Sequence, residues 1–197
     1  AHGGTTTIID FAVQTKGQAL RPGLETWMAK AEGKCAIDYG FHMIMGDVTD
    51  ATLEEMDALV DEGVTDFKLF TAYPGVFLSD DGAIFRAMRR TAENGGLILM
   101  HAENGVAIDI VANANAEAGL TDPYYHGVSR MPVFEGECVN RVIRFAEAAT
   151  RVNAPLGQWI EIAGVDTQYA DLHRQILSGG RASGEEQLGM RLMVTLN

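Results

Sequence analysis

Short apolar runs alternate along this chain with longer segments in which apolar residues recur every three or four positions. The short runs are rich in β-branched and aromatic residues, a pattern typical of buried strands. The longer segments have helical periodicity and most of them end at or near a glycine. Strands are predicted at 5–11, 35–45, 64–70 and 97–100. Helices are predicted at 24–31, between residue 52 and Gly63, and at 81–94, 104–118 and 135–152.

One of these helices carries explicit start and stop signals. Thr52 and Glu55 have the spacing of a capping box, and Gly63 follows as the stop. The segment 120–132 lies between the last two predicted helices and is predicted to be a loop. It carries Pro123, His126 and Arg130.

The order of these elements predicts an α/β protein with a parallel sheet covered by helices. A closed barrel and an open doubly wound sheet both satisfy this order. The sequence GxGxxG, which marks a dinucleotide site after a first strand, is absent, and this favours the barrel. A complete barrel takes roughly 250 residues, and only four strands are predicted before residue 157. We therefore expect part of a TIM-type (β/α)8 barrel, in a segment of a longer protein.

The composition is that of one soluble globular unit. The 197 residues are 47% hydrophobic and 21% charged, which is typical of a chain that buries a core. No uninterrupted apolar run has the roughly eighteen residues of a membrane span, and the first residues do not have the pattern of a signal peptide. We expect a cytoplasmic protein without a membrane partner.

Charge and cysteine content narrow the function further. With 27 acidic and 15 basic residues the net charge is −12, the wrong sign for binding a nucleic-acid backbone. Cys35 and Cys138 do not form a CxxC pair, and both are expected to be buried free thiols.

A lysine stands where a buried strand is predicted to end. Lys68 lies near the end of the strand 64–70, and His101 directly follows the strand 97–100. Active residues of βα barrels lie at the carboxyl ends of the strands, so both side chains are predicted to project to one rim. The alternatives are a lysine that reaches solvent at that rim and a histidine that only leads into a loop.

Burial of Lys68 would give this pair a definite chemistry. A lysine whose pKa is lowered by burial can add carbon dioxide and become a carbamate, an anion whose two oxygens can bridge two divalent metal ions. Metal ions held in this way activate water for attack at neutral pH, and a histidine ring nitrogen is a suitable further ligand. A Schiff-base lysine is the competing interpretation.

Three short sequences and a longer segment resemble one enzyme family in order and spacing. "GGTTTIIDF", "DFKLFTAY", "HAENG" and "HGVSRMPVFEGECVNRVIRFAEAA" are similar to segments of the hydantoinase and dihydropyrimidinase branch of the cyclic amidohydrolases. The resemblance covers residues 1–156, and it is specific because the pieces occur together.

The resemblance implies a metallohydrolase with two divalent metal ions, usually zinc, that opens the ring of a hydantoin or a dihydropyrimidine. Lys68 falls on the family's carboxylated bridging lysine, and His101 on a histidine ligand of the second metal. Tyr73 falls on a tyrosine that contacts the substrate and can donate a hydrogen bond to the oxygen that develops negative charge. A packed loop aromatic is the alternative for Tyr73. The family commonly forms tetramers, so a homo-oligomer is expected.

Other polar residues receive plainer interpretations. His42 lies within a predicted strand and is interpreted as a core or near-rim histidine. Glu103 and Asn104 are expected to shape a loop and cap the next helix. His126 and Arg130 match no ligand of the family.

The chain also departs from the family pattern. The paired histidines of an H-x-H motif would fall before Ala1, and Ile160 stands near the place of a further histidine ligand. The family's downstream aspartate also has no counterpart. Residues 157–197 form an unmatched tail, for which a frameshifted or chimeric end and true divergence are the competing explanations. With this incomplete ligand set, we expect the isolated chain to have little or no activity.

Two other classes of protein compete with the hydrolase. A non-catalytic relative could keep the fold as a scaffold for assembly, although retention of Lys68 and His101 counts against it. An aldolase-type barrel would use Lys68 as a Schiff base.

Overall fold

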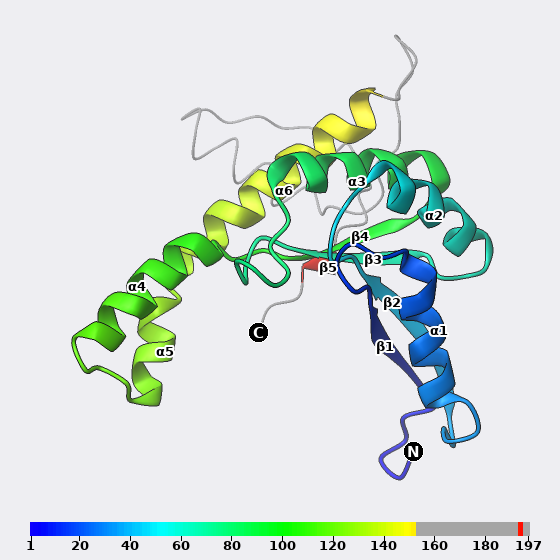
Figure 1. Cartoon of the computed structure of the whole chain (residues 1–197), viewed down its shortest axis with the longest axis horizontal. Helices are drawn as coiled ribbons and strands as arrows, with labels where there is room; N and C mark the ends of the chain where they lie inside the picture. The colour runs from blue at the N-terminus through cyan, green and yellow to red at the C-terminus, as the bar shows by residue number, and fades with distance from the viewer. Residues whose placement is uncertain (153–192, 195–197) are drawn as a thin grey trace, which may run out of the picture.

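The computed structural model describes residues 1–152 and 193–194, which form an α/β unit (Figure 1). The predicted tail 157–197 lies outside the described residues except for its short strand at 193–194. The strands are β1 (Thr7–Val13), β2 (Asp38–Ile44), β3 (Asp66–Phe70), β4 (Leu97–His101) and β5 (Met193–Val194). The helices are α1 (Leu20–Ala31), α2 (Asp50–Asp61), α3 (Asp81–Asn94), α4 (Gly105–Glu117), α5 (Pro123–Ser129) and α6 (Pro132–Val152).

All of these strands are parallel, and their spatial order is the same as their order in the chain. β1 pairs with β2, β2 with β3, β3 with β4 and β4 with β5. A doubly wound sheet reverses its strand order at a switch point, and the described sheet has no such reversal. The arrangement is therefore part of a (β/α)8 barrel, as predicted.

The two faces of the sheet differ in character because successive side chains point to opposite faces. One face carries Met43, Phe67, Leu69 and Met100, which are fully buried and form the core with residues of the helices α1, α2, α3 and α6. The opposite face corresponds to the inside of a barrel. It carries Lys68, which makes this the face on which a site can form.

The helix α2 begins earlier than predicted. Thr49 is its N-cap, and the capping box joins Thr49 to Thr52, so the prediction of a box between Thr52 and Glu55 is wrong. The Glu55 carboxylate instead accepts a hydrogen bond from the backbone N–H of Leu20, at the start of α1, at 2.5 Å. A contact between two helices has replaced a local contact that the sequence alone would favour.

The segment predicted as a loop, 120–132, contains the helix α5. Asp122 caps this helix by accepting a hydrogen bond from the backbone N–H of Tyr124, and Pro123 occupies its first turn. The prediction of a loop here is wrong in part, because proline at a first helical position is a helix start signal. The helices α4 and α5 lie side by side as a hairpin that projects away from the sheet (Figure 1).

The strand β1 exists as predicted but is not buried over its length. Thr7 to Asp10 are exposed, and only Ala12 lies in the core. β1 is an edge strand of the described sheet, with pairing to β2 alone, and α1 packs against it. The described helices include none that is both long enough and apolar enough to cross a bilayer.

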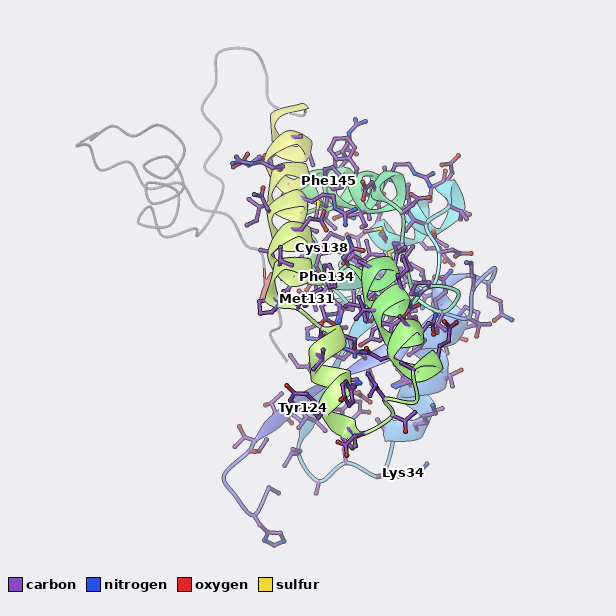
Figure 2. The ribbon with its side chains drawn as sticks, turned by 90° about the vertical axis from the view of Figure 1, so that its left-hand side faces the viewer. Lys34, Tyr124, Met131, Phe134, Cys138 and Phe145 are labelled. Atoms are coloured by element: carbon purple, nitrogen blue, oxygen red, sulfur yellow. The ribbon has the colours of Figure 1, made fainter. Side chains whose placement is uncertain are left out.

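The two cysteines differ in exposure. Cys138 on α6 is fully buried as predicted, whereas Cys35, in the turn after α1, is exposed, so the prediction for Cys35 is wrong. Burial also raises the pKa of the Cys138 thiol, which leaves less reactive thiolate. Figure 2 shows Cys138 on α6, between Phe134 and Phe145.

This difference predicts stepwise thiol reactivity. In the folded chain one thiol should react rapidly with an aromatic disulfide reagent, and the second should react only after denaturation. Cys35→Ser should remove the rapid phase. Equal rates for both thiols in the folded protein would contradict the assigned burial of Cys138.

Candidate active site

Lys68 and His101 come from adjacent strands and lie on the same face of the sheet. In the register of β3 and β4, Lys68 pairs with Leu99, and Phe70 pairs with His101. Residues two apart on a strand share a face, so the lysine and the histidine are diagonal neighbours near the carboxyl ends. Lys68 is 5% exposed and His101 is 9% exposed. The predicted meeting of these two residues at one rim follows directly from this register.

Two aromatic rings lie near the buried amine of Lys68. Its Nζ lies 5.3 Å from the centroid of the Phe70 ring and 6.0 Å from that of Phe11. Burial lowers the pKa of Lys68 because an apolar environment disfavours the charged ammonium. A larger share of neutral amine follows, and neutral amine is the form that reacts with carbon dioxide.

His101 is the last residue of β4, and its ring is held on several sides. Its Nε2 lies 2.7 Å from the Glu103 carboxylate. The ring stacks on Phe70 at 5.7 Å between centroids and contacts the ring of Tyr73 at 5.1 Å. The partner role of Glu103 was missed in the sequence, although a carboxylate two residues after a candidate ligand is a usable signal.

Tyr73 stands beside His101 in an unusual backbone conformation. Its φ is 61°, in the left-handed region that bulky residues rarely adopt. The Tyr73 carbonyl oxygen accepts hydrogen bonds from the backbone N–H groups of Val76, Phe77 and Leu78, and this tight turn holds the conformation. The side chain is 40% exposed, so the ring covers His101 on one side and faces solvent on another.

Hydrogen bonds of Thr71 clamp the loop after β3 to the loop after β4. The Thr71 hydroxyl donates to the carbonyl oxygens of His101, at 3.1 Å, and Glu103, at 2.7 Å. The backbone N–H of Gly105 donates to the Thr71 carbonyl oxygen at 3.2 Å. A Cβ atom on Gly105 would lie 2.5 Å from the Cα of Ala72, so only glycine permits this approach. Hydrogen bonds between the two loops thus hold Tyr73 beside His101, whereas the strand register places Lys68 next to them.

The remaining polar candidates have structural roles or indirect ones. His42 lies inside β2, with its Nδ1 3.4 Å from the Asp66 carboxylate, and is half-buried. Asn104 caps α4 as predicted, by accepting a hydrogen bond from the backbone N–H of Ala107. Arg130 was given no role, yet its Nε lies 3.9 Å from Glu103.

The described residues fit part of a metal site. They contain no group of three or more His, Cys, Asp or Glu side chains arranged to hold a metal ion. Lys68 supplies a buried amine, as a carbamate would require. His101 has one ring nitrogen in contact with Glu103, and the lone pair of the other nitrogen could bind a metal ion. Further ligands would have to come from residues beyond those described.

Comparison with known proteins gives consistent results. No family model matches the chain. The D-hydantoinase of Streptomyces coelicolor is 62% identical over 156 residues, which are 79% of this chain and 33% of that protein. The D-hydantoinase of Geobacillus stearothermophilus is 47% identical over 150 residues, or 76% of this chain and 32% of that protein.

Solved structures agree. A dihydropyrimidinase from Brevibacillus agri superposes with a TM-score of 0.73 at 42% identity, covering 75% of this chain and 32% of that one. A D-hydantoinase structure superposes with a TM-score of 0.76 at 35% identity, covering 98% of this chain and 39% of that one. The chain spans about a third of the length of the curated relatives it matches.

The sheet, the covering helices and these similarities define the class of the chain as a TIM-barrel amidohydrolase, represented here by part of the barrel. Within that class the chain belongs to the hydantoinase and dihydropyrimidinase family.

Proposed function

We propose that this chain supplies part of the active site of a metal-dependent hydrolase that opens a cyclic ureide, either a hydantoin or a dihydropyrimidine. The observation that carries the proposal is the placement of Lys68 and His101 on one buried face at the ends of two adjacent strands, with Tyr73 against the histidine. The named activity of the similar D-hydantoinases supports the same substrate class.

In this proposal Lys68, as its carbamate, and His101 hold two divalent metal ions, most simply zinc. Bound metal ions would supply a hydrolytic nucleophile at neutral pH and polarise the substrate carbonyl. Burial of Lys68 favours the neutral amine that forms the carbamate. Tyr73 donates its hydroxyl proton in a hydrogen bond to the substrate oxygen that gains negative charge.

Assembly and location are part of the same proposal. We infer a homo-oligomer, a tetramer as in the resembled family, acting on a small-molecule substrate in the cytoplasm. The net charge of −12 supports a small-molecule partner over a nucleic acid, whose backbone is also negative.

A segment exchange tests the function directly. Residues 1–156 of this chain would replace the matched residues of the Streptomyces coelicolor D-hydantoinase, and ring opening of hydantoin and dihydrouracil would be followed with and without zinc. We expect metal-dependent hydrolysis by the exchanged enzyme and little or none by the 197-residue chain alone. A folded, metal-loaded exchanged enzyme without turnover would favour the scaffold, and borohydride trapping of a carbonyl substrate on Lys68 would favour the aldolase.

Tyr73→Phe should lower the kcat of the exchanged enzyme roughly 10²- to 10³-fold, the usual cost of one lost hydrogen bond to a developing oxyanion. KM should change little, because the hydrogen bond strengthens only as charge develops. Tyr124→Phe, at an exposed position on α5, is the matched control. Full activity of Tyr73→Phe would leave Tyr73 as a packing residue.

A further inference from the structure

We propose that Glu103 is a positioning residue for His101: its carboxylate engages Nε2, so that Nδ1 is the nitrogen left to bind a metal ion. This inference deepens the proposed function and rests on it for the role of His101. It is carried by one short contact and by the groups that fix both partners.

The contact itself determines which ring nitrogen is available. Nε2 of His101 lies 2.7 Å from Oε2 of Glu103, a distance typical of a charge-assisted hydrogen bond. An ionised carboxylate only accepts hydrogen bonds, so Nε2 must be the donor. In a neutral imidazole the other nitrogen, Nδ1, then keeps its lone pair.

The backbones of both partners are tied to the strand β3. The Thr71 hydroxyl donates to the carbonyl oxygen of Glu103, and the N–H and hydroxyl of Thr71 both donate to the carbonyl oxygen of His101. The two residues therefore keep their spacing while the side chains meet.

The side chains are restrained as well. The His101 ring lies against Phe70 and Tyr73, which limits its rotation. Arg130, which follows α5, places its Nε 3.9 Å from Oε1 of Glu103, the oxygen that does not contact His101. Each carboxylate oxygen thus has its own partner, and the carboxylate is held from the side of the α4–α5 hairpin.

The arrangement has a consequence for metal affinity. A ligand histidine whose second nitrogen donates to a carboxylate has a fixed orientation and a more basic ligating nitrogen, and loss of such a partner typically costs 10- to 100-fold in metal affinity. The same loss is expected here for Glu103→Ala.

Nuclear magnetic resonance of the ¹⁵N-labelled 197-residue chain tests the orientation without any metal. The chain has five histidines, and His101→Gln identifies the His101 signals. We expect the neutral His101 ring to carry its proton on Nε2, in the contact with Glu103, and to exchange that proton slowly with water. Glu103→Ala should abolish the slow exchange, and Glu103→Gln, which keeps an acceptor oxygen, should preserve part of it. Glu117→Ala, exposed at the end of α4, should change nothing.

A zinc titration of the exchanged enzyme, with the same substitutions made in it, completes the test, because the isolated chain carries only part of the ligand set. We expect Glu103→Ala to weaken Zn²⁺ binding 10- to 100-fold relative to the unsubstituted exchanged enzyme and to Glu117→Ala. A neutral His101 ring protonated on Nδ1, unchanged exchange in Glu103→Ala, or unchanged zinc affinity in that variant would overturn the role of Glu103. If the exchanged enzyme binds no zinc, that result counts against the proposed function, and the proton measurement alone decides the role of Glu103.

Discussion

Lys68→Ala is expected to remove both bound metal and ring-opening activity from the exchanged enzyme. Alanine cannot form a carbamate, so the site would lose the anion proposed to hold the metal ions. Metal ions stabilise the charge of a hydrolytic transition state by several kcal/mol. Loss of this stabilisation should lower the rate of ring opening roughly a thousandfold or more. Metal content by mass spectrometry and hydrolysis of hydantoin measure the two losses.

Two further variants separate the carbamate from simple effects of charge. Lys68→Arg keeps length and positive charge, but the guanidinium stays protonated and cannot add carbon dioxide, so it should be as inactive as Lys68→Ala. Lys34→Ala removes a lysine at an exposed position in the turn after α1 (Figure 2) and should retain full activity and metal. Parental turnover and metal content in Lys68→Ala would refute the proposed function.

Gly105→Ala is expected to damage the site without touching a catalytic group. The added Cβ would lie 2.5 Å from the Cα of Ala72 and 2.9 Å from the backbone nitrogen of Tyr73, so the loop after β3 must move. Overpacking of this kind costs about 1–3 kcal/mol of stability. Displacement of Tyr73 by about 1 Å should reduce kcat roughly a hundredfold in the exchanged enzyme.

Gly136→Ala is the matched control, because this residue of α6 has nothing within 4 Å of the position of an added Cβ. There alanine should be neutral or stabilise the helix by about 0.5–1 kcal/mol. Urea unfolding of the 197-residue chain measures both variants. Equal stability and equal activity of the two alanine variants would show that the approach of Gly105 to Ala72 does not hold Tyr73.

Local signals were sufficient for most of the secondary structure. The helix α3 has the predicted bounds, since Asp80 caps its start and Gly95 adopts the left-handed conformation at its end. The start of α2 was misplaced because Glu55, the residue expected to close the capping box, binds the start of α1 instead. A local signal fails where a partner distant in the chain takes over the same side chain.

The placement of the candidate site was predictable to a similar extent. Lys68 and His101 were predicted as candidates because strand ends are where a barrel builds its site, and the register of the parallel strands places them on one face as expected. The contact of Glu103 with His101 was overlooked although the two residues are close in the sequence. The contact of Arg130 with Glu103 could not be predicted, because the spacing of Arg130 from β4 does not reveal that the chain after α5 lies near Glu103.

By itself the sequence determined the strands, most of the helices, and the two candidate site residues, Lys68 near the end of β3 and His101 at the end of β4. It could do so because the periodicity of apolar residues and the helix caps are signals that act over a few residues. Only the tertiary structure decided that the sheet is ordered as in a barrel, that Gly105 fits against Ala72, and that Glu103 binds His101 while Arg130 contacts Glu103. These features depend on strand register and on contacts between loops, which bring together groups that no local periodicity relates.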